Sequence, residues 1–97
     1  MTMTPTGASV TITIVQAPAC HLCQDAESAV AQLATDYPIR TQVLDIGSAE
    51  GLALVQAHRP AMNPLVLLDG QFFSAGRLPR GKLRATLAAR DDVALVG

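Results

Sequence analysis

Charged and aromatic side chains are scarce in this chain of 97 residues. Charged residues make up 15% of it, the aromatic residues are one Tyr and two Phe, and Trp is absent. The net charge of −1 at pH 7 favours neither nucleic acid nor an anionic membrane surface as a partner. The core is therefore expected to be aliphatic, built from Val, Leu, Ile and Ala.

Long apolar runs and early positive charge are also lacking. No apolar stretch approaches the roughly 18 residues of a membrane-spanning helix, so no membrane partner is expected. No Lys or Arg occurs before Arg40, whereas a secretory signal peptide would need positive charge near its start. We therefore expect a cytoplasmic protein. A chain of this length should form one domain, covering residues 10–97 behind a flexible N-terminus at residues 1–9.

Positive charge is concentrated in the last quarter of the chain, in a cluster of Arg77, Arg80, Lys82 and Arg84. A solvated helix face explains such a cluster more simply than a binding site does. Four charges without interleaved aromatic residues are weak evidence for nucleic-acid binding. No nucleic-acid partner is therefore expected.

The only two cysteines lie in the motif Cys20-His21-Leu22-Cys23. This motif stands between a β-type run at residues 10–16 and a helical pattern that opens at His21. At such a junction the first sulfur lies near the helix N-terminus, where unpaired N–H groups and the helix dipole favour a thiolate. The thiolate is the form that attacks a disulfide, so thiol–disulfide exchange is our first interpretation and metal ligation the second.

Apolar periodicity predicts four strands and three helices in the order βαβαββα. We expect the strands at residues 10–16, 39–46, 65–68 and 71–74. We expect the helices at residues 21–37, from an N-cap at Ser48 to about residue 58, and from Pro79 to residue 90, with residues 91–97 as a short tail.

The predicted connections indicate a mixed sheet. The first β-α-β unit should form a parallel pair of strands. Asp69-Gly70 between two apolar runs is a signal for a two-residue hairpin, so the last two strands should be antiparallel neighbours. The continuous apolar run at residues 65–68 is typical of a strand that is covered on both faces.

This element order, with Cys-x-x-Cys at the first strand–helix junction, resembles the thioredoxin fold in its short, glutaredoxin-like form. The resemblance covers residues 10–90 and implies an α/β fold with a four-stranded mixed sheet and three helices. A second motif supports it, because Asn63-Pro64 stands directly before the third strand, where thioredoxin-like proteins place a cis-proline that faces the dithiol.

The resemblance also implies roles for individual residues. Cys20 matches the nucleophile that forms a mixed disulfide with the substrate, and Cys23 matches the resolving cysteine. Pro64 matches the cis-proline, and the backbone of Asn63 would pair with the substrate chain as a strand edge does. His21 and Leu22 occupy the variable dipeptide that adjoins the substrate.

Two arginines complete the predicted substrate site. Arg59 falls near the basic residues that glutaredoxins use to bind a ligand carboxylate, and Arg77 could face the rim of the active site. The chain departs from glutaredoxins at Ser74-Ala75-Gly76-Arg77, where they often carry Gly-Gly followed by Asp, and it has no basic residue at positions 16–19. Glutathione as the reductant therefore stays open, whereas the thiol chemistry does not depend on it.

Other interpretations of the two cysteines remain. A closed zinc site normally takes four N or S ligands, and a second Cys-x-x-Cys motif is missing, but a metal or Fe–S cluster shared between two chains is an alternative. A second alternative is a thioredoxin-like scaffold that only binds a partner and whose thiols do not react. The preferred interpretation is a monomeric thiol–disulfide oxidoreductase without an organic cofactor. Its partners would be a protein or low-molecular-weight disulfide and an external thiol reductant.

Overall fold

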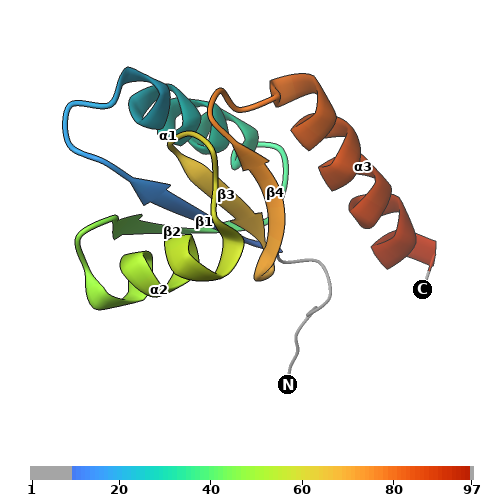
Figure 1. Ribbon diagram of the computed structural model, residues 1–97. Coiled ribbons are helices and arrows are strands. Elements are labelled where there is room, and N and C mark those ends of the chain that lie inside the picture. The colour runs from blue at the N-terminus through green and yellow to red at the C-terminus, as the bar shows by residue number, and fades with distance from the viewer. Residues whose placement is uncertain (1–9, 97) are drawn as a thin grey trace.

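The computed structural model describes the backbone of residues 10–96 and the side chains of residues 10–89. Within this part of the chain the elements follow in the order βαβαββα (Figure 1). The strands are β1 (Val10–Gln16), β2 (Ile39–Asp45), β3 (Leu65–Leu68) and β4 (Gln71–Ala75), and the helices are α1 (His21–Leu33), α2 (Ala49–His58) and α3 (Arg80–Val96). The flexible segment expected at residues 1–9 lies outside the described residues.

The strands form one mixed sheet in the order β2-β1-β3-β4. β1 and β2 are parallel and pair without interruption from Val10↔Ile39 to Gln16↔Asp45. β3 is antiparallel to both of its neighbours, β1 and β4. The predicted α/β class, the parallel first pair and the antiparallel hairpin are therefore confirmed.

The hairpin turn uses the two residues that the sequence indicated. Asp69 and Gly70 have φ angles of 49° and 85°, and positive φ at both central positions is what a type I′ turn requires. The Asp69 carboxylate accepts a hydrogen bond from the Thr11 N–H at 2.9 Å, and the Asp69 N–H donates to the Thr11 carbonyl at 2.8 Å. These two bonds fix the tip of the hairpin to the start of β1.

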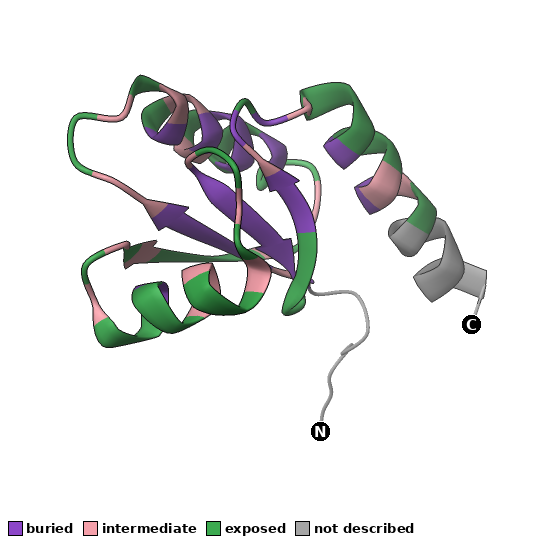
Figure 2. Ribbon diagram, viewed as in Figure 1, coloured by how far each residue is buried: buried purple, intermediate pink, exposed green. Residues whose placement is uncertain are grey.

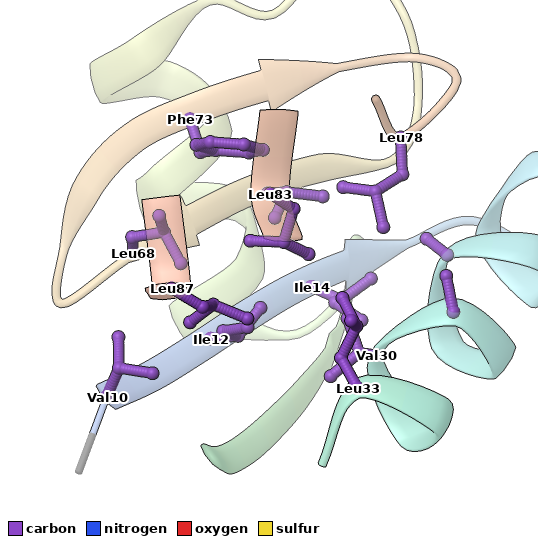
Figure 3. Packing of buried hydrophobic residues seen from close by; sticks show 13 residues of the cluster. Val10, Ile12, Ile14, Val30, Leu33, Leu68, Phe73, Leu78, Leu83 and Leu87 are labelled. Carbon is purple, nitrogen blue, oxygen red and sulfur yellow. The ribbon is translucent and has the colours of Figure 1, made fainter. Parts of the chain in front are cut away.

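Helices cover both faces of the sheet, with α1 and α3 on one face and α2 on the other (Figures 1 and 3). The α2 face has a small core of Val15, Leu65 and Leu67, with Leu54 and Val55 of α2 packed against it. The opposite face has the larger core (Figure 3), which consists of Val10, Ile12, Ile14, Ala26, Ala29, Val30, Leu33, Val66, Leu68, Phe73, Leu78, Leu83 and Leu87. Alternate residues of β3 enter different cores, as predicted for a strand covered on both faces. Figure 2 shows the resulting contrast between the buried β3 and the largely exposed edge strand β2.

Helix α1 ends at Leu33, four residues before the predicted end at Tyr37. The chain leaves the helix through a tight turn, in which the Thr35 hydroxyl donates to the Gln32 carbonyl at 2.7 Å and the Thr35 N–H donates to the same carbonyl at 3.2 Å. Pro38 then favours extended backbone in the residue before it. The prediction extended the helix too far because Tyr37 continues the apolar spacing and packs against the core.

Helix α3 begins one residue later than predicted and continues to Val96, so the predicted tail is wrong for residues 91–96. Pro79 precedes the helix, and its carbonyl accepts the Leu83 N–H at 3.0 Å. The sequence after residue 90 contains no Gly or Pro before Gly97, so no residue there interrupts the helix.

No helix within residues 10–96 is both long enough and apolar enough to cross a membrane.

Gly51 allows α2 to start directly against the end of β2. A Cβ atom added at Gly51 would clash with the Asp45 carbonyl oxygen and would lie 3.0 Å from Ser48 Oγ. Ser48 is the predicted N-cap, since its hydroxyl oxygen accepts the Gly51 N–H at 3.0 Å. The same hydroxyl donates to the Asp45 carbonyl at 2.6 Å. A residue without a side chain is therefore required where this helix meets the strand.

The variant Gly51→Ala is expected to lower the free energy of unfolding by about 2 kcal/mol or more, because a backbone carbonyl cannot move aside cheaply. The matched control is Gly81→Ala, where an added Cβ meets nothing within 4 Å in helix α3. That control should raise stability by about 0.5–1 kcal/mol. Urea unfolding followed by circular dichroism measures both, and equal effects of the two variants would contradict this account of Gly51.

Ser74 offers a second test of the packing. Its side chain is 8% exposed, and its hydroxyl has no hydrogen-bond partner among the described residues. Ser74→Ala should therefore leave stability unchanged or raise it by up to about 1 kcal/mol. The control is Thr13→Val, which removes a buried hydroxyl that does bond, to Gln42 Oε1 at 3.2 Å, and should be destabilising in the same unfolding assay. A comparable loss in both variants would show that the Ser74 hydroxyl has a partner.

Candidate functional site

Cys20 occupies the N-cap position of helix α1, at the end of the loop that follows β1. Ala19, with φ of 52°, turns the chain into the helix, and Cys20 itself is extended, with φ of −107°. The Cys20 sulfur accepts a hydrogen bond from the Cys23 N–H at 3.1 Å. The sulfur therefore has the role that an Asp or Ser oxygen has at most helix starts, and it faces unpaired backbone donors.

The two cysteines form a disulfide, with their Cα atoms 5.2 Å apart. They differ in accessibility, because Cys23 is only 1% exposed and Cys20 is half-buried at the surface. His21 is exposed and Leu22 is half-buried, so the predicted dipeptide lies at the rim of the pair. A Cys-x-x-Cys pair at disulfide distance, with one accessible and one buried sulfur, fits a redox site.

The proline loop lies at the same end of the sheet as the two cysteines. The Asn63–Pro64 peptide bond is cis, and Pro64 is buried directly before β3. Val15 pairs with Leu65, so the end of β1 that leads to Cys20 lies next to the start of β3. The strand register thus brings Asn63 and Pro64 to the dithiol end.

Arg77 reaches this end through the loop that follows β4. Ala75 pairs with Leu65, and the Gly76 N–H donates to the Pro64 carbonyl at 3.0 Å. Gly76 has a φ of 87°, a backbone conformation that suits glycine, and Arg77 follows it with an exposed side chain. The structure therefore places Arg77 beside the proline loop.

Arg59 does not lie at the dithiol end of the sheet. It is the C-cap of α2, with φ of 49°, and follows His58. The His58 ring lies 6.4 Å from the Phe72 ring, measured between centroids, and Phe72 pairs with Leu67 toward the hairpin end of β3. The carboxyl end of α2 therefore lies toward the hairpin and away from Pro64, as the path of the chain in Figure 1 shows.

Met62 is a neighbour of the proline loop that the sequence analysis did not single out. Its side chain is 56% exposed, yet its sulfur would lie only 3.3 Å from a Cβ added at Gly76. Met62 therefore covers Gly76 and presents an apolar surface next to Asn63 and Pro64. Its position two residues before the proline is the only sequence signal that could have identified it.

Metal ligands do not gather at the site. Within the described part of the chain, no group of three or more His, Cys, Asp and Glu side chains is arranged to hold an ion. His21 is exposed beside the cysteines, and His58 lies against Phe72. The arrangement is suited to reversible formation and cleavage of one disulfide.

Comparison with known proteins leaves the family open, since no protein-family model and no curated protein matches the chain. A four-stranded mixed sheet with three helices and a Cys20-x-x-Cys23 pair is compatible with a thioredoxin-like fold.

The different burial of the two sulfurs predicts different reactivity after reduction. Iodoacetamide should modify Cys20 first and leave Cys23 largely unmodified in the folded protein, because Cys23 is 1% exposed. Peptide mapping by mass spectrometry at several short reaction times measures the two rates, and a denatured sample provides the control. Equal rates in the folded protein would contradict the assignment of Cys20 as the accessible sulfur.

Proposed function

We propose that this protein is a glutaredoxin-like thiol–disulfide oxidoreductase of the thioredoxin fold, with Cys20 as the nucleophile and Cys23 as the resolving cysteine. The observation that carries the proposal is the N-cap geometry of Cys20. Its sulfur is at once the helix cap, the more accessible of the two sulfurs and the disulfide partner of buried Cys23.

The reaction proceeds in two exchanges. The Cys20 thiolate attacks one sulfur of a substrate disulfide, forming a mixed disulfide and releasing the first substrate thiolate. The Cys23 sulfur then attacks Cys20 Sγ, which releases the second substrate thiolate and forms the Cys20–Cys23 disulfide. The substrate gains two electrons and two protons as two thiols, and the protein dithiol loses them.

Each residue of the α1 start has a defined part in this cycle. The Cys23 N–H and the helix dipole stabilise negative charge on Cys20 Sγ in the free thiolate, which is the form that attacks the substrate disulfide. β1 contains no carboxylate, so the Cys23 proton passes to water or to the departing substrate thiolate. A thiol reductant from outside the protein must then reduce the disulfide, which requires a compartment with a reducing thiol pool such as the cytoplasm.

The proposed substrate groove lies over Pro64 and the backbone of Asn63, with His21, Leu22 and Arg77 at its rim. An extended substrate segment would pair with the Asn63 backbone, which precedes the first residue of β3. Met62 and Leu22 offer apolar contacts on this surface, and Arg77 offers a positive charge. Arg59 is left out of the groove because α2 ends toward the hairpin.

Cys20→Ser is expected to abolish disulfide reduction, with turnover of a dithiothreitol-coupled protein disulfide falling by about 100-fold or more. Cys23→Ser is the matched control, because it removes one thiol as well but keeps the nucleophile. It should accumulate a mixed disulfide between Cys20 and the substrate, visible as a mass increase equal to one substrate thiol. Turnover by Cys20→Ser equal to that of the parent protein would refute the proposed function.

A further inference from the structure

A cavity of about 120 Å³ lies between helices α1 and α3, on the face of the sheet that carries the larger core. It is lined by Ala29, Gln32 and Leu33 of α1 and by Arg80 and Arg84 of α3. Ala29 is six residues beyond Cys23, which corresponds to about 9 Å along the helix axis. The cavity is therefore separate from the dithiol, and it contains Arg80 and Arg84, two members of the basic cluster that the proposed function does not use.

The cavity combines an apolar wall with cationic and amide groups. Ala29 and Leu33 line the cavity and also belong to the core, so they form its apolar wall. Arg80 and Arg84 are one turn apart on α3, which places their side chains on the same face of the helix. Two planar guanidinium groups at this spacing can bind a single anion together.

The two arginines are held to very different degrees by the carboxylates near them. Arg80 Nη2 lies 2.6 Å from Asp25 Oδ1, which is a direct hydrogen bond. Arg84 Nη1 lies 3.8 Å from Asp36 Oδ2, beyond hydrogen-bond distance. The Arg84 side chain makes no hydrogen bond within the part of the chain that the structure describes. Its five N–H donors are available, and its exposed pair with Asp36 contributes little to hold it.

A ligand that bridges both arginines must compete with Asp25 and Asp36. A carboxylate ligand has only two oxygens, the same number that each aspartate already offers to these arginines. A phosphate monoester offers three terminal oxygens and close to two negative charges, so it can accept from Arg84, from the remaining donors of Arg80 and from the Gln32 amide at once. The cavity has a volume of about 120 Å³, which is room for a phosphate group.

We propose that this cavity binds the phosphate group of a small phosphate monoester, held by Arg80 and Arg84 with Gln32. The apolar wall of Ala29 and Leu33 contacts the ester carbon. Binding draws Arg84 away from Asp36 and keeps the pair between Arg80 and Asp25. The site is separate from the thiol chemistry, because within the described residues no hydrogen bond or ion pair joins Arg80, Arg84 or Gln32 to the cysteines or the proline loop.

The test is a titration of ¹⁵N-labelled protein with methyl phosphate, with inorganic phosphate in a second titration and sodium chloride at equal ionic strength as the blank. Methyl phosphate should produce saturable shifts in the Gln32 side-chain amide and in the backbone amides of Ala29 and Leu33. A monoester site predicts that methyl phosphate binds at least as tightly as inorganic phosphate. Shifts that do not saturate, or that chloride reproduces, would overturn the proposal.

Three variants make the test specific. Arg84→Gln should weaken the binding of methyl phosphate by about tenfold, because it removes one charged fork from the anion. Asp36→Asn should tighten it, because the substitution removes the carboxylate that competes for Arg84. Lys82→Gln is the matched control, since its ammonium lies 5.2 Å from the Phe73 ring centroid, outside the cavity lining. Equal affinities in Arg84→Gln, Asp36→Asn and Lys82→Gln would contradict the proposed site.

Discussion

The central strand β1 is the constraint on which the rest of the structure depends. It pairs with β2 on one side and with β3 on the other, and alternate side chains enter the two cores. Ile12 and Ile14 pack under α1 and α3, whereas Val15 packs under α2. Because β1 runs parallel to β2 and antiparallel to β3, its carboxyl end meets the start of β3. That meeting places the loop to Cys20 beside Pro64.

The chemistry of the site follows from what happens directly after β1. The chain turns through Ala19 into α1, and the N-cap residue of this helix is Cys20. A sulfur in the N-cap position receives the Cys23 N–H and the positive end of the helix dipole. The same turn of helix buries Cys23 beneath it. One local structure therefore supplies an accessible sulfur, its stabilisation and its partner.

Much of this arrangement could be predicted from the sequence, because it depends on local rules. Alternation at residues 10–16, the Asp69-Gly70 turn and the Ser48 cap each indicate one structure, and the structure confirms them. The predicted ends of α1 and α3 were wrong, because apolar spacing such as that of Tyr37 does not show where the hydrogen bonds of a helix stop. The places of Arg59 and Met62 depend on how α2 and two loops pack, which no local pattern encodes. The roles assigned to the site residues remain predictions.

The proposed chemistry depends on one property of the molecule, that the helix start holds Cys20 as a thiolate once the disulfide is reduced. The most direct measurement is the thiolate absorbance near 240 nm as a function of pH, recorded on the reduced parent protein and on Cys23→Ser. We expect one thiol to ionise with a pKa clearly below the value of about 8.5 for free cysteine, and we expect this transition to persist in Cys23→Ser. Ionisation of both thiols at or above that value would contradict this expectation.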